Sequence, residues 1–180
     1  MKISSGKYRG RLIRMPKNIR PTQGKVRKAL FDILGDIKGL SFLELFAGSG
    51  AVGFEALSRG AADLTLVEYN PGCLQAIRKN MESLKIKACS LYPHQAQRAI
   101  EMLQGEGRKF DIIFLDPPYY MDASKKTLKA LGGYDILTRN GLLVVQHFKK
   151  DTLDERTGSL TLIKRARYGD TLLSFYRKVA

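Results

Sequence analysis

The sequence predicts a three-layer α/β sandwich on a seven-stranded, mostly parallel sheet. Apolar runs with strand periodicity alternate with segments of helical periodicity along most of the chain, which is typical of parallel sheets covered by helices. Near the C-terminus the order changes, because strand-like runs at 159–163 and 172–176 flank the turn Tyr168-Gly169-Asp170 with no helix between them. An antiparallel hairpin is therefore expected to close the sheet.

The chain has 180 residues, which suits a single domain. We expect residues 1–35 to form a basic N-terminal arm and helix, and residues 36–180 to form a Rossmann-like core. No apolar run reaches the roughly 20 residues of a membrane span, and no signal peptide is recognisable. With Cys73 and Cys89 expected to be reduced thiols, the predicted location is cytoplasmic.

The elements follow in order from the N-terminus. Residues 5–16 predict a short hairpin or extended arm, with Gly6 and Gly10 as turn residues. A helix follows, for which Thr22 is the expected N-cap and Gly35 the end. Strands are then expected at 41–46, 64–68, 88–91, 110–115 and 142–145, with helices at 51–59, 71–84 and 95–103. Asn70 and Pro71 are suited to cap and begin the second of these helices.

Positive charge is concentrated at the N-terminus. The chain carries a formal net charge of +14, of which residues 1–40 hold +9, and no acid precedes Asp32. A patch of this kind attracts polyanions, whereas the alternative is a solvated basic face. We expect a nucleic-acid backbone to bind the basic N-terminal segment, residues 2–28. The expected contacts are Arg9, Arg11, Arg14, Arg20 and Lys25.

A glycine turn, residues 44–50, joins the first strand of the core to its helix. Gly48, Gly50 and Gly53 have the spacing GxGxxG, and small residues here let a cofactor approach the backbone. Glu68 ends the second strand, where an acid can bind both hydroxyls of an adenosine ribose. The predicted cofactor residues in these two elements are Glu44, Phe46, Ala47, Gly48, Ser49, Gly50 and Glu68. Dinucleotide cofactors would use the same pattern, and a plain structural turn is the remaining alternative.

The sequence Asp116-Pro117-Pro118-Tyr119 follows the apolar strand at 110–115 and distinguishes among these cofactors. An exocyclic amine of a base is a poor nucleophile until its nitrogen becomes pyramidal, and acceptors aimed at its N–H bonds favour that change. The Asp116 carboxylate and the Pro117 carbonyl can supply both acceptors, while the two prolines restrict the backbone. Tyr119 offers a face on which a base can stack.

These motifs resemble the amino-methyltransferases of class I fold, and within them the RsmD family of small-subunit ribosomal RNA guanine-N2 methyltransferases. The resemblance covers nearly the whole chain. The matching positions are Tyr8-Arg9-Gly10-Arg11, Arg20-Pro21-Thr22, Val26-Arg27, Leu30-Phe31, Phe46-Ala47-Gly48-Ser49-Gly50, Glu55-Ala56-Leu57-Ser58-Arg59-Gly60-Ala61, Glu68, Asp116-Pro117-Pro118-Tyr119 and Tyr168-Gly169-Asp170. It implies S-adenosylmethionine as cofactor and, as substrate, 16S ribosomal RNA or an assembling small ribosomal subunit.

One position departs from the family pattern. The family commonly has an acid at the start of the helix after the third strand, to hold the adenine amine of the cofactor, and this chain reads His94-Gln95-Ala96. Gln95 can accept a hydrogen bond through its amide oxygen. We therefore include Gln95 among the cofactor-binding residues.

Two other functions remain open from the sequence. An adenine-N6 DNA or RNA methyltransferase would share the Asp116–Tyr119 motif, although the chain has no additional target-recognition segment. A nucleic-acid-binding protein could also keep this fold without activity. We expect no metal site, because His94 and His147 have no second metal-type ligand near them in sequence.

Overall fold

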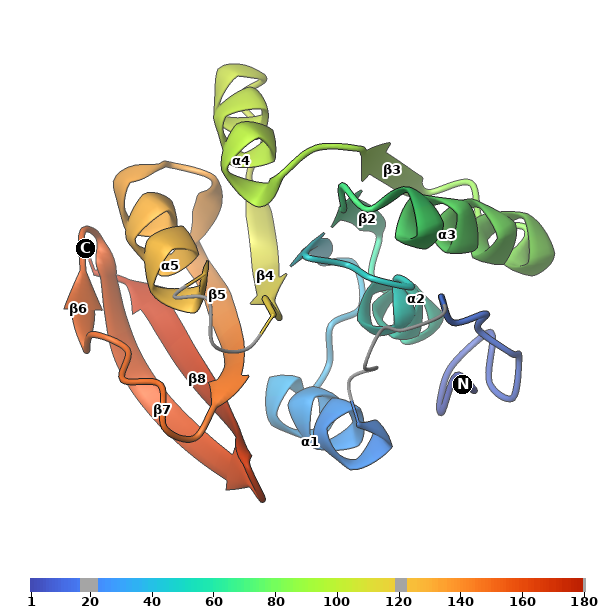
Figure 1. Cartoon of the computed structure of the whole chain (residues 1–180), viewed down its shortest axis with the longest axis horizontal. Coiled ribbons are helices and arrows are strands. Elements are labelled where there is room, and N and C mark those ends of the chain that lie inside the picture. Colours follow the sequence, from blue (N-terminus) through green and yellow to red (C-terminus); the bar gives the residue numbers. More distant parts are fainter. Residues whose placement is uncertain (17–22, 119–122, 180) are drawn as a thin grey trace. The chain divides into compact units, whose positions relative to one another are not determined.

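The computed structural model of the chain describes residues 1–16, 23–118 and 123–179 (Figure 1). Their contacts divide the chain into two compact units, Met1–Gln95 and Ala96–Ala180. Each unit has its own set of strands and helices. The predicted single domain of residues 1–180 stays a prediction.

The first unit alternates helices and strands. Its elements are α1 (Gly24–Leu34), β1 (Ser41–Leu45), α2 (Ala51–Ser58), β2 (Asp63–Val67), α3 (Pro71–Leu84) and β3 (Cys89–Tyr92). The strands pair in parallel in the order β3-β2-β1, with Leu45 opposite Val67. Because parallel strands end at the same edge, the segments that follow β1 and β2 lie side by side.

Local sequence explains where α3 begins. The side chain of Asn70 accepts hydrogen bonds from the N–H groups of Gly72 (2.9 Å) and Cys73 (3.3 Å), and Pro71 occupies the first turn. The cap satisfies two donors that have no partner within the helix, and proline lacks the donor that would be unpaired there. The predicted cap and start of this helix are confirmed.

The N-terminus forms the predicted hairpin. Lys2 pairs with Leu12 in an antiparallel bridge, and the turns at Gly6 and Gly10 have φ of 78° and 82°. Ile3 and Ile13 are both 2% exposed, so the hairpin contributes to the core of the first unit. Burial of two isoleucines stabilises its attachment by about 3–6 kcal/mol as an upper bound. The hairpin is therefore part of the folded unit.

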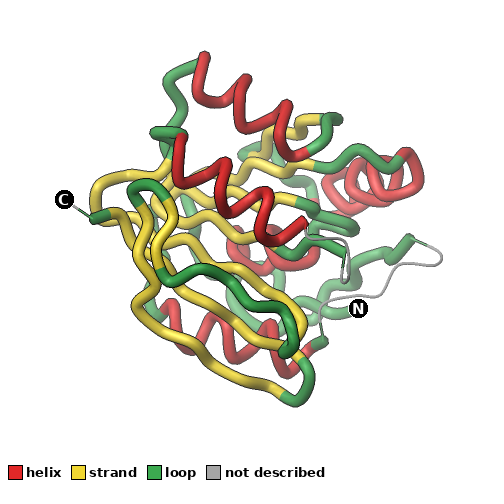
Figure 2. Tube along the Cα trace, turned by 60° about the vertical axis from the view of Figure 1, so that its left-hand side comes forward, coloured by secondary structure: helices red, strands yellow, loops and turns green. Residues whose placement is uncertain are grey.

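In the second unit, helices and strands alternate as far as β5, and the last three strands are antiparallel. Its elements are α4 (Ala96–Gly105), β4 (Phe110–Leu115), α5 (Ala123–Gly133), β5 (Leu137–Phe148), β6 (Arg156–Thr157), β7 (Leu160–Tyr168) and β8 (Thr171–Lys178). The strand order is β4-β5-β8-β7-β6, in which only the β4–β5 pair is parallel. Figure 2 shows strands and loops without a helix in the last part of the chain.

The structure corrects two predictions and adds one element. Gln23 occupies the N-cap position of α1 and makes no side-chain cap bond, whereas Thr22, the predicted cap, lies outside the described residues. The described residues form eight strands rather than seven, because the two-residue strand β6 pairs with β7. A helix, α5, follows β4, for which no bounds were predicted.

Candidate active site

The glycine turn after β1 is held in one conformation by backbone hydrogen bonds. The N–H of Ala47 donates to Val67 O (3.0 Å), and the N–H of Gly50 donates to Ala47 O (2.7 Å). Gly48 and Gly50 have φ of 57° and 75°, and Phe46 has φ of 60°. A positive φ is costly for a side chain such as that of Phe46, and strain of this kind is concentrated at functional sites. Phe46 and Gly48 are the half-buried residues of the turn, so a ligand would meet them first.

Glu44 is 3% exposed and its carboxylate binds the N-terminal turn of α2. Its Oε2 accepts a hydrogen bond from the N–H of Gly53 (2.8 Å), a donor in the first turn of the helix. A carboxylate at a helix N-terminus satisfies an unpaired donor and interacts favourably with the helix dipole. A Cβ at Gly53 would lie 2.8 Å from Glu44 Oε2 and 2.7 Å from Leu64 Cδ1. A side chain at Gly53 would therefore displace the ends of the Leu64 and Glu44 side chains, so glycine is the residue that fits the packing of α2 on the strands.

Glu68 follows β2 and lies beside the glycine turn. Its Oε2 accepts from the N–H of Gly48 (2.8 Å), and its Oε1 accepts from the N–H groups of Tyr69 and Asn70 (both 2.8 Å). The residue is 7% exposed. A carboxylate has about four acceptor positions, so these three bonds leave room for a further donor. The structure thus brings Glu68 and Gly48 together, and their role in binding a cofactor stays a prediction.

Gln95 lies immediately before α4 and is exposed. It is the last residue of the first unit, which also holds the other predicted cofactor residues. Its assignment to the adenine stays a prediction.

The predicted catalytic motif directly follows β4 in the second unit. β4 is parallel to β5, with Leu115 opposite Val145, so Asp116 stands at the carboxyl end of a parallel strand pair. Asp116 is half-buried, Pro117 is buried and Pro118 is exposed. The carboxylate is therefore placed between the core and the surface. Tyr119 lies outside the described residues.

The predicted nucleic-acid residues are exposed where the structure describes them. Arg9, Arg11 and Arg14 lie in or directly after the hairpin, and Lys25 lies on α1. The guanidinium of Arg11 also donates to Ser83 O (2.7 Å), so this residue has a local partner. Arg20 lies outside the described residues.

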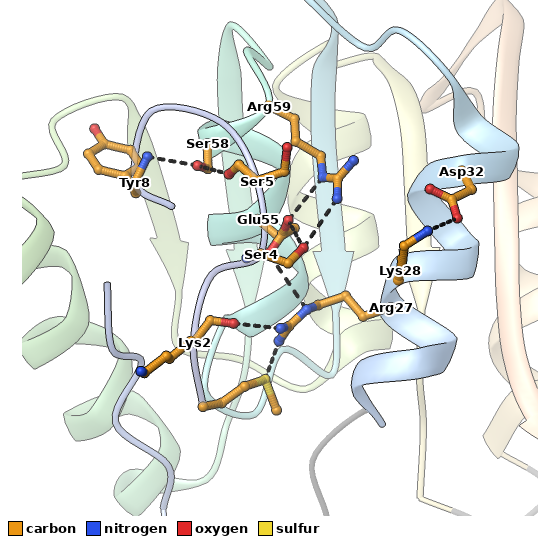
Figure 3. A network of polar contacts seen from close by, with 11 residues as sticks. Lys2, Ser4, Ser5, Tyr8, Arg27, Lys28, Asp32, Glu55, Ser58 and Arg59 are labelled. Carbon is orange, nitrogen blue, oxygen red and sulfur yellow. Dashed lines mark hydrogen bonds and ion pairs between the residues drawn. The ribbon is translucent and has the colours of Figure 1, made fainter. Parts of the chain in front are cut away.

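A buried charge network attaches the hairpin to α2, and the sequence did not indicate it (Figure 3). Glu55 is 0% exposed and accepts hydrogen bonds from the N–H and the hydroxyl of Ser4 (2.8 and 2.6 Å). Arg59 donates to the same carboxylate (3.0 Å), and Arg27 forms a longer ion pair with it (3.7 Å). Arg27 is 5% exposed and donates to Lys2 O (2.7 Å), and its burial lowers its pKa from the ordinary value. One of the ten basic residues in 2–28 is thus used inside the fold.

Ser58 completes this attachment. Its hydroxyl donates to Ser5 O and accepts from the N–H of Tyr8 (2.5 and 2.8 Å), and its carbonyl accepts from the N–H of Lys7 (2.8 Å). A Cβ at Gly6 would lie 1.7 Å from Ser58 O, so only glycine fits there. The ALSRGA segment of the family resemblance therefore includes the receptor for the hairpin. The sequence motif marks Ser58 as a residue of interest. It could not show the role of Ser58, because the hydrogen-bond partner Tyr8 lies 50 residues away in the sequence.

Both cysteines are thiols that resist ionisation. Burial raises the pKa of the Cys73 thiol to about 11 and that of Cys89 to about 12, and both cysteines are free. Among the described residues, no three His, Cys, Asp or Glu side chains gather as metal ligands would. No helix in the described ranges is long and apolar enough to cross a membrane.

Comparison with solved structures identifies the fold. The chain is similar to a solved structure named "Putative methyltransferase yhhF from Escherichia coli", at 30% identity and a TM-score of 0.84, covering 100% of this chain and 98% of that one. It also matches a hypothetical protein of Thermus thermophilus at 31% identity and a TM-score of 0.87, covering 99% of both chains. A more distant structure, named "a putative methyltransferase complexed with SAH", is similar at 18% identity and a TM-score of 0.65, covering 86% of this chain and 48% of that one. The fold is the Rossmann-like α/β fold of S-adenosylmethionine-dependent methyltransferases.

Sequence comparison identifies the family. The family model described as Conserved hypothetical protein 95 matches residues 1–177. A Bacillus subtilis protein named "Putative rRNA methyltransferase YlbH" is 33% identical over 99% of both chains. Ribosomal RNA small subunit methyltransferase D of Escherichia coli K12 is 31% identical over 100% of this chain and 91% of that protein. The chain belongs to this family, the RsmD-like methyltransferases.

Proposed function

We propose that the chain transfers a methyl group from S-adenosylmethionine to the exocyclic N2 amine of a guanine in small-subunit ribosomal RNA. The observation that carries methyl transfer to an exocyclic amine is the Asp116-Pro117-Pro118 sequence directly after the parallel strand β4, and the choice of guanine N2 rests on the family resemblance. The family relatives named small subunit methyltransferase D support the class of substrate.

The residues of the first unit fit the proposed cofactor. The turn at residues 46–50 presents Phe46 and the backbone of Gly48 at the edge where β1 and β2 end. The Glu68 carboxylate adjoins Gly48, as ribose recognition at the end of a second strand requires. Dinucleotide cofactors use the same geometry, but relatives with this family's sequence are methyltransferases. When bound, S-adenosylmethionine supplies an electrophilic methyl group on a sulfonium.

Asp116 and Pro117 act on the nucleophile in this proposal. Their acceptors, a carboxylate and a backbone carbonyl, bind the two N–H bonds of the amine and favour the pyramidal nitrogen that attacks. Pro117 and Pro118 fix φ near −65°, so that the carbonyl is already aimed before the base arrives. Asp116 also stabilises the positive charge that develops as the nitrogen becomes four-coordinate, and the proton then leaves to solvent. No covalent intermediate on the enzyme is needed, so catalysis comes from orientation and electrostatics.

Exposed basic residues of the N-terminal segment bind the RNA backbone in this proposal. Arg9, Arg14 and Lys25 are exposed cations on elements that the core holds in place. Backbone contacts position the RNA without reading its sequence, and base recognition is left to the Asp116 region. The proposed substrate is either free rRNA or an assembling small subunit, and the protein acts in the cytoplasm, where both occur.

The test is transfer of a labelled methyl group from S-adenosylmethionine to small-subunit rRNA, free and in isolated subunits, prepared from cells that lack this protein. Transfer to either substrate supports the proposal. Binding of both cofactor and RNA with no transfer to either substrate would instead favour an inactive nucleic-acid-binding protein. Transfer to DNA adenine alone would favour an adenine-N6 enzyme.

A further inference from the structure

Asn80 is a polar side chain buried in the middle of the first unit. It lies on α3 and is 0% exposed. Burying an amide is costly unless its donors and acceptor are paired. The described contacts pair all of them: Oδ1 accepts from the N–H of Arg14 (2.8 Å), and Nδ2 donates to Arg14 O (3.0 Å) and Ser49 O (3.1 Å). Asn80 thus joins two segments that are far apart in the sequence.

The first contact fixes the chain after the hairpin. Asn80 binds both the N–H and the carbonyl of Arg14, as a neighbouring β-strand would. Arg14 follows the buried Ile13, and the chain then continues toward residues 17–22. The two bonds therefore fix the Arg14 backbone directly after the hairpin.

The second contact fixes the glycine turn. The peptide between Ser49 and Gly50 has its carbonyl bound by Asn80 Nδ2 (3.1 Å) and its N–H bound by Ala47 O (2.7 Å). A peptide plane held at both ends cannot rotate without breaking one of these bonds. Ser49 is 4% exposed, so water does not readily replace the lost partner.

We propose that Asn80 is a positioning residue that links cofactor binding at the glycine turn to RNA binding at the basic N-terminal segment. The proposal rests on the proposed function for the identity of the two ligands. A displacement of the turn by the cofactor is transmitted through the Asn80 amide to the Arg14 backbone, and a displacement of that backbone by RNA is transmitted in reverse. Such linkage is reciprocal, so each ligand must strengthen binding of the other by the same factor.

These contacts need a side chain that both accepts and donates hydrogen bonds, as the Asn80 amide does. Aspartate has the same shape but no donor, so its carboxylate would face the carbonyls of Arg14 and Ser49. Alanine removes all three bonds and leaves the Arg14 and Ser49 backbone groups without this partner. Ile77, on the same helix and 0% exposed, offers a matched control, because Ile77→Val removes buried volume and leaves the three Asn80 hydrogen bonds with their donors and acceptors.

The test measures binding of S-adenosylhomocysteine alone, of small-subunit rRNA alone, and of each in the presence of the other. For the wild type we expect each ligand to tighten the other by about fivefold or more. For Asn80→Ala and Asn80→Asp we expect that factor to fall below about twofold, because the connection between the two segments is lost. Ile77→Val should lower thermal stability and keep the wild-type factor.

A second measurement needs no variant. Hydrogen exchange of the wild type should show that S-adenosylhomocysteine slows exchange of the Arg14 amide, which donates to Asn80. No protection of this amide, or an unchanged coupling factor in a folded Asn80 variant, would overturn the inference. Failure of the wild type to bind S-adenosylhomocysteine would instead overturn the proposed function.

Discussion

At the scale of single residues, Asp116 and Glu68 are both carboxylates that follow parallel strands, but their surroundings differ. Glu68 accepts three backbone N–H bonds, one of them from the glycine turn, and is 7% exposed. Asp116 is half-buried at the end of β4. The first environment suits a residue that shapes and binds a cofactor site, and the second suits a residue that meets a substrate.

Asp116→Ala is expected to lower methyl transfer by about 10²–10³-fold or more, with cofactor affinity within a few-fold of wild type, because its carboxylate acts on the amine. Glu68→Ala should behave in the opposite way, because it removes both the ribose acceptor and the partner of the Gly48 N–H. Its cofactor Kd should rise, and transfer should recover at saturating cofactor. Titration calorimetry and initial rates separate the two. Loss of cofactor binding in Asp116→Ala, with turnover retained at saturation, would reverse these roles.

The positions of functional residues were predictable where a sequence motif marks them. They were less predictable where a residue is buried only through contact with a distant segment. The glycine turn, Glu68 and Asp116 follow strands whose apolar runs are visible in the sequence, so their positions could be inferred. Asn80 and Glu55 are polar residues within helices, and a helix pattern alone assigns such residues to solvent. Their burial follows from the hairpin segment, which contacts them from a distant part of the sequence.

At the scale of elements, the hairpin depends on one buried acid. Glu55 binds Ser4, Arg27 and Arg59, and its removal would leave the 5% exposed Arg27 without its counter-ion. Glu55→Ala is expected to reduce the free energy of unfolding by about 3–5 kcal/mol. Limited proteolysis should also cut the hairpin faster, since several of its bonds go to Glu55 or to partners of Glu55.

An exposed ion pair provides the control for this prediction. Lys28 and Asp32 pair at 2.7 Å, but their side chains are 70% and 54% exposed. Asp32→Ala should cost less than about 1 kcal/mol, because solvent screens the pair. Equal losses of stability for Glu55→Ala and Asp32→Ala, measured by denaturant unfolding, would show that the network does not hold the hairpin.

A buried histidine makes the second unit sensitive to acid. His147 on β5 is 1% exposed, and its Nε2 lies 2.8 Å from Ser174 Oγ on β8. Burial lowers the pKa of His147 below its ordinary value, despite the Phe148 carbonyl and Asp151, which raise it. Below a pH of about 6.5, His147 therefore binds a proton in the unfolded chain but stays neutral in the folded chain until the pH is lower. The contribution of neutral His147 to the free energy of unfolding is therefore fully present above that pH and is lost progressively as the pH falls.

His147→Gln should flatten this decline, because it removes the titrating group and keeps a polar contact to Ser174. Unfolding free energies between pH 7.5 and 5.5 provide the comparison. The same slope in wild type and variant would assign the pH dependence to other groups.

Most element boundaries were predictable from periodicity. The strand expected at 159–163 is longer, since β7 runs from Leu160 to Tyr168, and two further exceptions are informative. β5 was expected at 142–145 but runs from Leu137 to Phe148, because polar and exposed residues at 138–140 break the apolar run while pairing continues on both sides. Helix α5 buries Ser124 and Thr127 beside its leucines, so its apolar stripe is weak in the sequence. In both cases tertiary pairing overrides the local pattern.

At the scale of the whole molecule, the charge of +14 is expected to act through particular exposed residues. Arg9 and Arg14 provide the cleaner test, because the Arg11 guanidinium also binds Ser83 O. Arg9→Glu with Arg14→Glu should weaken RNA binding and reduce the slope of log affinity against log salt by about 2, since each lost phosphate contact contributes about 1. Cofactor affinity and thermal stability should change little.

A matched variant separates local contact from total charge. Lys164 and Arg177 are exposed in the second unit, and their joint replacement by glutamate changes the net charge by the same amount. This control should keep the wild-type salt slope. Equal weakening by both variants would assign RNA binding to overall charge, and no weakening by either would leave the basic residues with a role in solubility.

The most direct test of the proposed function is the identity of the modified nucleoside. Small-subunit rRNA from cells that lack the protein is incubated with the protein and S-adenosylmethionine, then digested to nucleosides and resolved by chromatography and mass spectrometry. We expect N2-methylguanosine at a level that rises on incubation and does not rise with Asp116→Ala. N6-methyladenosine as the sole product, or no new methylated nucleoside from either free rRNA or small subunits, would contradict the proposed function.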